Sequence, residues 1–469
     1  MKVDSLVIFS LLAFSRILGT LSQCFDYPNP LNRTYKISTT CPMEKQQKSI
    51  KFATSYSQQN GENMFLLTFT CGIPDVALCD KAKNAFESAG KIISSTLQLN
   101  TPINLNASFL DFCKTLGECP KGGFVTLGGA TPARTIPLQD NDGLVRLYPQ
   151  ALVKQFQFKQ HPSFGPFDIT ALFNAVGASY WFEGDPPISR EQQDFLYVAI
   201  HEMIHGLGFA SGWEDYVNET PEALTPEISI SGNPLKQFMF EGFLESAFDR
   251  HIIHIPTGKR LSAFTGELNK FQNAFGVNFQ SDIDFITKFR SSPQYQLAKE
   301  VMSYSIVHNT LGFLPRGTTK ADDAIILETS LVPYQPGSSV SHVDFKTYNN
   351  TIDFLMKYLA DHGADLKTLI AIRNGNNYGE VKTVISPKLK LILETMGYST
   401  PDYTNPYKPS VTIIGNNFDP TVNEPIEPGN ANEKAINNSH KKSNADVKTN
   451  KLDFWMILIV NLLILIIMR

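Results

Sequence analysis

The segment VAIHEMIHGLGFASGW contains two histidines, His201 and His205, with Glu202 directly after the first of them. In an α-helix, residues four positions apart lie on the same face, so both imidazoles can bind one metal ion. Glu202 then lies about 100° around the helix, where its carboxylate can take a proton from a water that zinc activates. The spacing predicts a zinc site with Glu202 as general base. The alternative is a buried helix with two hydrogen-bonded histidines.

Two histidines do not hold a catalytic zinc by themselves, because such sites use three protein ligands. The stretch HEMIHGLG resembles the first part of the metzincin pattern His-Glu-x-x-His-x-x-Gly-x-x-His, with Gly208 at the turn out of the helix. Ser211 stands where this pattern has its third histidine, and a hydroxyl is a poor zinc ligand. We therefore expect the third ligand to come from a distant part of the chain.

The segment GSSVSHVDFKTYNNTIDFLMKY resembles the leishmanolysin-like metzincins, in which a long insertion separates the helix from the third histidine. The resemblance implies that His342 is the third zinc ligand and that Met356 lies in a methionine turn beneath the metal. It also implies that Tyr358 helps Glu202 in catalysis by stabilising the oxyanion. The implied activity is that of a zinc metalloendopeptidase, which would hold polypeptide substrates extended across a cleft.

Other residues compete for the third position. Met302 and Tyr304 in EVMSYS also resemble a methionine turn, with His251 or His254 as the ligand. A thermolysin-like site would use a glutamate, and four glutamates follow the helix at suitable distances: Glu222, Glu227, Glu241 and Glu245. Asp249 is interpreted as a surface ion-pair partner, with support of the site as its alternative role.

The N-terminus and the cysteines predict export from the cell. Residues 1–22 have the charge, apolar run and small residues of a signal peptide. Six cysteines suggest three disulfides, with short separations for Cys71–Cys79 and Cys113–Cys119 and with Cys24 and Cys41 left over, although sequence alone does not choose the pairing. Glycosylation sequons agree with this compartment and occur at Asn32, Asn106, Asn218, Asn349 and Asn437.

The C-terminal end predicts attachment to a membrane. Residues 401–451 are rich in proline and asparagine and are expected to form an extended stalk. Residues 452–469 are apolar and follow a small triplet and a polar spacer, which is typical of a glycolipid anchor signal; a transmembrane tail helix is the alternative. We expect a secreted protein anchored to the outer face of the plasma membrane.

The chain has 469 residues and a net charge of −4, which gives no reason to expect nucleic-acid binding. We expect an N-terminal disulfide-containing segment over 23–79 and a catalytic domain over 80–400. The expected fold class is α+β and metzincin-like (zincin-like), with a sheet-bearing N-terminal subdomain that carries the active-site helix and a mostly helical C-terminal subdomain. A zinc-free structural or adhesive surface protein on a zincin-like scaffold is the alternative function, and a zinc hydrolase acting on non-peptide substrates is a third.

Hydrophobic periodicity predicts the individual elements. Strands are expected over 102–112 and 122–138 and over 167–182, the last as the edge strand that aligns substrate. The long active-site helix is expected over 188–209, capped by Ser189 with Gln192 as its partner. Further helices are expected near 80–97 and over 233–252, 292–307, 351–363 and 386–398.

Overall fold

The computed structural model describes residues 22–45, 63–119, 125–233, 235–271, 277–375 and 384–410. The predicted signal peptide through residue 21, most of the predicted stalk, the apolar C-terminal tail and the sequon at Asn437 lie outside these residues. Within the described ranges, no helix has both the length and the apolar character needed to cross a bilayer.

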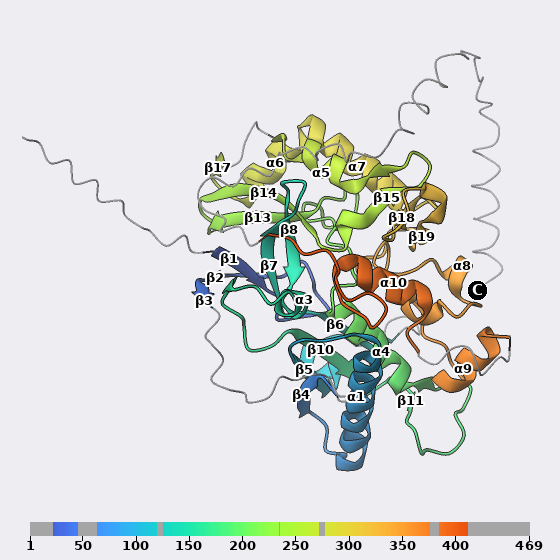
Figure 1. Cartoon of the computed structure of the whole chain (residues 1–469). Coiled ribbons are helices and arrows are strands. Elements are labelled where there is room, and N and C mark those ends of the chain that lie inside the picture. The colour runs from blue at the N-terminus through green and yellow to red at the C-terminus, as the bar shows by residue number, and fades with distance from the viewer. Residues whose placement is uncertain are drawn as a thin grey trace, which may run out of the picture. The chain divides into compact units, whose positions relative to one another are not determined.

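The fold is mixed α+β, as predicted (Figure 1). A four-stranded sheet has the order β4 (Phe65–Cys71), β5 (Ile103–Leu110), β10 (Ile169–Asn174) and β6 (Gly128–Pro132). The first three strands are parallel, and β6 runs antiparallel to β10 at the edge. Residues of β5 alternate between buried and half-buried, which matches the alternation in its sequence.

Two helices, α1 (Val76–Thr96) and α4 (Phe195–Gly206), pack against each other and against this sheet (Figure 1). The side chain of Asp75 caps α1 by accepting the backbone N–H of Leu78. Between the two helices and the sheet lies an aromatic core, in which the rings of Phe86 and Phe195 meet edge to face at 5.5 Å. Burial of these rings fixes α4 against the sheet and thereby fixes the histidines that α4 carries.

A second sheet joins distant parts of the chain in the order β13 (Glu227–Gly232), β14 (Phe238–Ser246), β8 (Val145–Pro149), β7 (Arg134–Gln139), β1 (Ser22–Asp26) and β2 (Ile37–Cys41). A seventh strand, β17 (Val277–Phe279), pairs with β14. Because β1 pairs with β7, the start of the N-terminal segment is part of the main body. Its hairpin partner β2 is joined to β1 by the Cys24–Cys41 disulfide.

Smaller elements complete the described chain. Paired short strands are β3 (Met43–Lys45) with β9 (Gln160–Pro162), and β11 (Tyr180–Trp181) with β12 (Gln193–Asp194); β15 (Ile252–His254), β16 (Lys259–Arg260), β18 (Leu311–Phe313) and β19 (Ile325–Ile326) form a further sheet. The remaining helices are α2 (Phe112–Leu116), α3 (Gln150–Gln155), α5 (Leu261–Leu268), α6 (Asp282–Arg290), α7 (Pro293–Ser305), α8 (Phe345–Tyr348), α9 (Leu366–Arg373) and α10 (Pro387–Met396).

Several predicted elements are confirmed, namely the helices near 80–97, 292–307 and 386–398 and the strand over 102–112. The three disulfides are also present, as Cys24–Cys41, Cys71–Cys79 and Cys113–Cys119. The chain remains packed against the body beyond residue 400, because the hydroxyl of Tyr407 donates to Asp140 at 2.9 Å and Ser410 bridges to Gln139.

Two helix predictions are wrong. Residues 233–252 contain strand β14, because its buried Phe238 and Phe240 pack against aromatic rings of β17 and α6. The predicted C-terminal subdomain is therefore not simply helical: strands β13–β19 lie between its helices. Residues 351–363 form only a 3-10 turn over Phe354–Met356, and the carbonyl of Leu355 is taken by His201 instead of by a helical N–H.

The edge-strand and capping predictions are also wrong. Strand β10 lies inside the sheet, and β6 forms the edge instead. Helix α4 begins only at Phe195, with Asp194 as its N-cap, whereas Ser189 and Gln192 form a separate turn. Asp194 also accepts the backbone N–H of Leu366 at 2.8 Å, so a contact distant in sequence selects the cap.

Replacing Gly208 with alanine should destabilise the fold. Gly208 ends α4 with φ of +105°, and an added Cβ would lie 2.4 Å from Cγ of Pro149 and 3.1 Å from Cε of Met396. Strain and overpacking together should cost roughly 2–4 kcal/mol in the free energy of unfolding. Urea denaturation measures this loss. The matched change Gly266→Ala in α5 meets open space and should not destabilise, so equal effects of both changes would contradict the explanation.

Candidate metal centre

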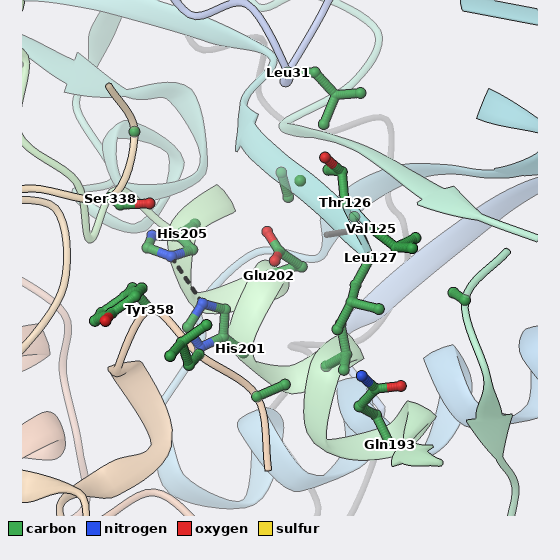
Figure 2. Close-up of a pocket in the computed structure, with 18 of the residues that line it drawn as sticks. Leu31, Val125, Thr126, Leu127, Gln193, His201, Glu202, His205, Ser338 and Tyr358 are labelled. Atoms are coloured by element: carbon green, nitrogen blue, oxygen red, sulfur yellow. Dashed lines mark hydrogen bonds between the residues drawn. The ribbon is translucent and has the colours of Figure 1, made fainter. Parts of the chain in front are cut away.

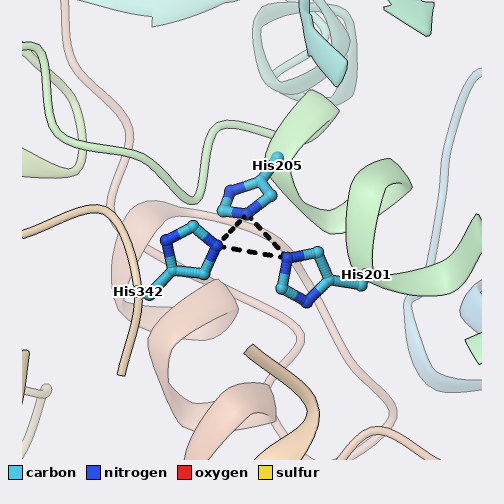
Figure 3. Close-up of side chains that lie close together, drawn as sticks. All are labelled: His201, His205 and His342. Atoms are coloured by element: carbon cyan, nitrogen blue, oxygen red, sulfur yellow. Dashed lines mark hydrogen bonds between the residues drawn. The ribbon is translucent and has the colours of Figure 1, made fainter. Parts of the chain in front are cut away.

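Helix α4 presents His201 and His205 on one face, toward a loop that carries His342 (Figure 3). The three Nε2 atoms form a nearly equilateral triangle: His205 lies 3.1 Å from both His201 and His342, and the last two are 3.2 Å apart. Three ligands of a tetrahedral ion at about 2.0–2.1 Å would lie about 3.3–3.4 Å apart. The triangle therefore has the size that a zinc ion requires.

The opposite ring nitrogen of each histidine donates to a backbone carbonyl. The Nδ1 atoms lie 2.7 Å from the carbonyl oxygen of Leu355 for His201, 2.6 Å from that of Phe209 for His205, and 3.0 Å from that of Ser338 for His342. Because a carbonyl can only accept, each Nδ1 carries the proton and each Nε2 presents a lone pair. Three lone pairs that point at one place repel one another unless a cation lies between them.

Burial keeps these imidazoles neutral. The three side chains are 9%, 7% and 7% exposed for His201, His205 and His342. Loss of hydration lowers the pKa of His201 to about 4 and that of His342 to about 3, and it lowers the pKa of His205 well below its usual value. Neutral imidazoles are the form that binds zinc, so the ligand set is in its binding state at neutral pH.

The turn around Met356 supports two of the three ligands. Its backbone supplies the Leu355 carbonyl to His201, and the carbonyl of Met356 accepts the N–H of Val343, next to His342, at 2.9 Å. The Met356 side chain is only 1% exposed. A single buried turn therefore connects the first helical ligand to the distant third one.

Asp249 fixes the loop in which Ser211 replaces a histidine. The carboxylate is fully buried and accepts the hydroxyl of Ser211 at 2.7 Å and the N–H groups of Gly212 and Ser246, each at 2.9 Å. The N–H of Ser211 in turn donates to the hydroxyl of Ser341, beside His342. The interpretation of Asp249 as a surface ion-pair partner is wrong, and the residue instead holds a loop against the third ligand.

Glu202 faces a cavity of about 740 Å³ that the three histidines also line (Figure 2). Its carboxylate accepts the backbone N–H of Ala130 in β6, and burial raises its pKa to about 8. A cation at the histidines would counteract this rise by favouring the charged carboxylate. Glu202 therefore lies beside the candidate metal position and is not one of its ligands.

Tyr358, two residues after Met356 in the chain, lines the same cavity (Figure 2). Its ring packs at 5.6 Å from that of Phe345, and burial raises the pKa of its phenol. The structure thus brings together all five predicted site residues: His201, Glu202, His205, His342 and Tyr358.

The competing ligand candidates have other partners. His254 stacks on Tyr304 at 3.9 Å, so the second methionine-turn candidate is an aromatic contact. Glu245 binds the buried Arg146, and Glu227 binds Lys36 and Tyr27. Across the described residues, the histidine triangle is the one cluster whose ligand atoms are close enough to share a metal ion.

The sequence did not reveal two parts of the site. The sequence predicts strands over 122–138, which include β6, but it did not show that β6 forms the edge of the sheet at the site. Arg33, which lines the cavity beside the histidines, belongs to an N-terminal loop in which the sequence showed a glycosylation sequon at Asn32 but nothing that points to the site. Only the Cys24–Cys41 pair signalled that this loop is held in place.

Replacing Asp249 with alanine should destabilise the protein, because the Ser211 hydroxyl and two partly buried N–H groups would lose their acceptor. The expected loss is about 2–4 kcal/mol in the free energy of unfolding, measured by urea denaturation.

The control is Asp322→Ala, which removes an exposed carboxylate and should change the free energy of unfolding little. A similar small effect at both positions would show that Asp249 is not a structural anchor.

Comparison with known proteins gives a family without a described activity. The SPBPB7E8-like family model matches residues 24–432. A protein of Schizosaccharomyces pombe, named Uncharacterized protein PB7E8.01, is 32% identical over 372 residues, which cover 75% of this chain. The chain spans 65% of the length of that relative. No solved structure matches the chain. The matched residues show that this chain belongs to the SPBPB7E8-like family.

Proposed function

We propose that this protein is a zinc metalloendopeptidase of the metzincin type. The single observation that carries the proposal is the triangle of unprotonated Nε2 atoms from His201, His205 and His342. The carboxylate of Glu202 beside it adds a general base to the ligand set. A zinc-free structural protein would have no use for three converging lone pairs, whereas a hydrolytic zinc site needs them together with this carboxylate.

Zinc, when bound, supplies the positive charge that polarises water and the scissile carbonyl. Glu202 takes a proton from the attacking water and passes it to the leaving amine. Tyr358 donates a hydrogen bond to the carbonyl oxygen as negative charge develops on it. The backbone carbonyls at Leu355, Phe209 and Ser338 hold the imidazoles in one tautomer throughout.

The substrate is proposed to be an extended polypeptide that pairs with the free edge of β6. The N–H of Asn174 donates to the carbonyl of Leu127 at 2.8 Å. This bond shows which residues of β6 direct their N–H and carbonyl groups toward β10. Because antiparallel bonds alternate, the backbone groups of Gly128 and Ala130 face away from β10. The backbone groups of Gly128 and the carbonyl of Ala130 can bond a peptide main chain along the cavity, whereas the N–H of Ala130 already donates to Glu202.

The proposed location is the outer face of the cell membrane. Three disulfides support an oxidising compartment. Attachment through the C-terminal residues, as a lipid anchor or a tail helix, remains part of the proposal and rests on the sequence pattern of that end.

Removing the third ligand tests the metal. The parent protein should contain about one zinc per chain. His342→Ala should bind zinc more than about 100-fold more weakly, because loss of a supporting contact alone costs roughly 10–100-fold. Atomic emission of the purified protein and competition with a chelating dye measure content and affinity. His254→Ala, which removes a histidine stacked on Tyr304, is the control and should keep the parent content.

Equal zinc content in the parent and in His342→Ala would move the third ligand elsewhere. A folded parent that binds no zinc would instead support the structural or adhesive function on a zincin-like scaffold.

Changing Glu202 to glutamine tests the reaction. The variant should retain zinc but cleave peptides about 10²–10⁴-fold more slowly, because the amide cannot accept the proton. Turnover of an internally quenched peptide, with zinc content measured on the same samples, gives the comparison. Cleavage at the parent rate would remove Glu202 from the mechanism, and cleavage of esters alone by the parent would indicate a hydrolase with non-peptide substrates.

A further inference from the structure

Arg33 lies on the wall of the cavity next to the ligand loops, although it belongs to the N-terminal loop that the Cys24–Cys41 disulfide closes. Its Nη2 donates to the carbonyl of Ser211 at 3.1 Å, and its Nη1 lies 3.4 Å from the hydroxyl of Ser341. These two bonds aim the half-buried guanidinium toward the histidines.

The guanidinium has no carboxylate partner among the described residues. Both printed hydrogen bonds use neutral acceptors, while a guanidinium has five N–H donors. Burial raises the pKa of Glu214, whose carboxylate accepts from Tyr334 and Gly337, and the charge of Arg33 opposes this rise more than any other neighbour does. The structure therefore holds a positive charge with spare donors at the cavity.

The two ends of the cavity have different linings. Arg33 shares a small neighbouring cavity with Thr131 and Pro132, at the C-terminal end of β6, and the buried Glu214 and Glu227 also line that small cavity. The lining near Gln193 includes the exposed Glu191, and the exposed Glu118 also lines the cavity. Figure 2 shows Leu31, from the loop of Arg33, and Gln193 far apart along the cavity. The one lysine that lines the cavity, Lys357, already pairs with Asp361.

We infer that Arg33 selects substrates by binding a carboxylate of the peptide at the end of the cleft beside Ser211. A guanidinium with spare donors binds a carboxylate most strongly through a bidentate, charge-assisted pair of hydrogen bonds. If the peptide runs antiparallel to β6, the carboxylate belongs to a residue before the scissile bond. This inference rests on the proposed peptidase function and adds the class of side chain that the site prefers.

The test compares peptides that differ only by glutamate or glutamine at one position, scanned across three positions on each side of the cleavage site. The peptides are acetylated and amidated, and a second set has a free C-terminal acid. The parent should cleave the glutamate peptide about ten-fold faster in kcat/KM at one position, as expected for a hydrogen bond to a charged group. A preference confined to free acids would identify the terminal carboxylate as the group that Arg33 binds.

Arg33→Gln should abolish the preference and keep the zinc content, because glutamine can still donate to the Ser211 carbonyl without the charge. Arg33→Lys should keep part of it. Lys236→Gln removes an exposed positive charge outside the cavity and should leave the preference intact. Binding of the same peptides to Glu202→Gln, with and without Arg33→Gln, gives a readout that needs no turnover.

Equal cleavage of glutamate and glutamine peptides by the parent at every position and with free acids would overturn the role of Arg33 while leaving the peptidase intact. A preference that survives in Arg33→Gln would also overturn it. A zinc-loaded parent that cleaves none of the peptides would overturn the peptidase function itself.

Discussion

Three hydrogen bonds from imidazole Nδ1 to backbone carbonyls are the constraint on which the rest of this site depends. Each bond places the proton on the outer nitrogen and turns the inner lone pair toward the other two rings. The carbonyls come from three separate loops, at Leu355, Phe209 and Ser338. A site of this kind exists only when all three loops are fixed, so much of the surrounding fold serves to fix them.

Each loop is fixed by a different device. The sharp exit from α4 at Gly208 brings the Phe209 carbonyl back to His205. The buried turn at Met356 supports His201 and also bonds the strand-like segment after His342. The buried carboxylate of Asp249 holds the Ser211 loop, which in turn contacts Ser341. Where the short metzincin pattern has a histidine, this chain has Ser211, which supports the loop of His342.

The N-terminal loop forms part of the cavity wall. Strand β1 enters the sheet beside β7, and its disulfide to β2 closes the loop that carries Leu31 and Arg33. Leu31 lies so close to Gly129 of β6 that a Cβ there would approach it to 2.8 Å. The segment before the helix-bearing sheet is therefore part of the wall of the cavity and belongs to the same folded body.

Features that depend on local spacing could be predicted from the amino-acid sequence. The four-residue interval between His201 and His205, the adjacent Glu202 and the glycine after the helix need only helix geometry to be interpreted. The short cysteine separations and the alternation of β5 are local in the same sense. The identity of His342 as the third member came from the family resemblance, and the meeting of the three rings required the folded chain.

Other elements could not be predicted, because a contact between residues distant in sequence outweighs their local preference. Residues 233–252 look helical, yet aromatic packing with β17 and α6 makes β14 a strand. Residues 351–363 look helical, yet His201 takes the carbonyl of Leu355 that a helix would need. Asp194 replaces Ser189 as the cap because Leu366 also bonds to it. Arg33 is held at the site by hydrogen bonds to Ser211 and Ser341. These residues are far from Arg33 in the sequence, and no pattern in the sequence links them.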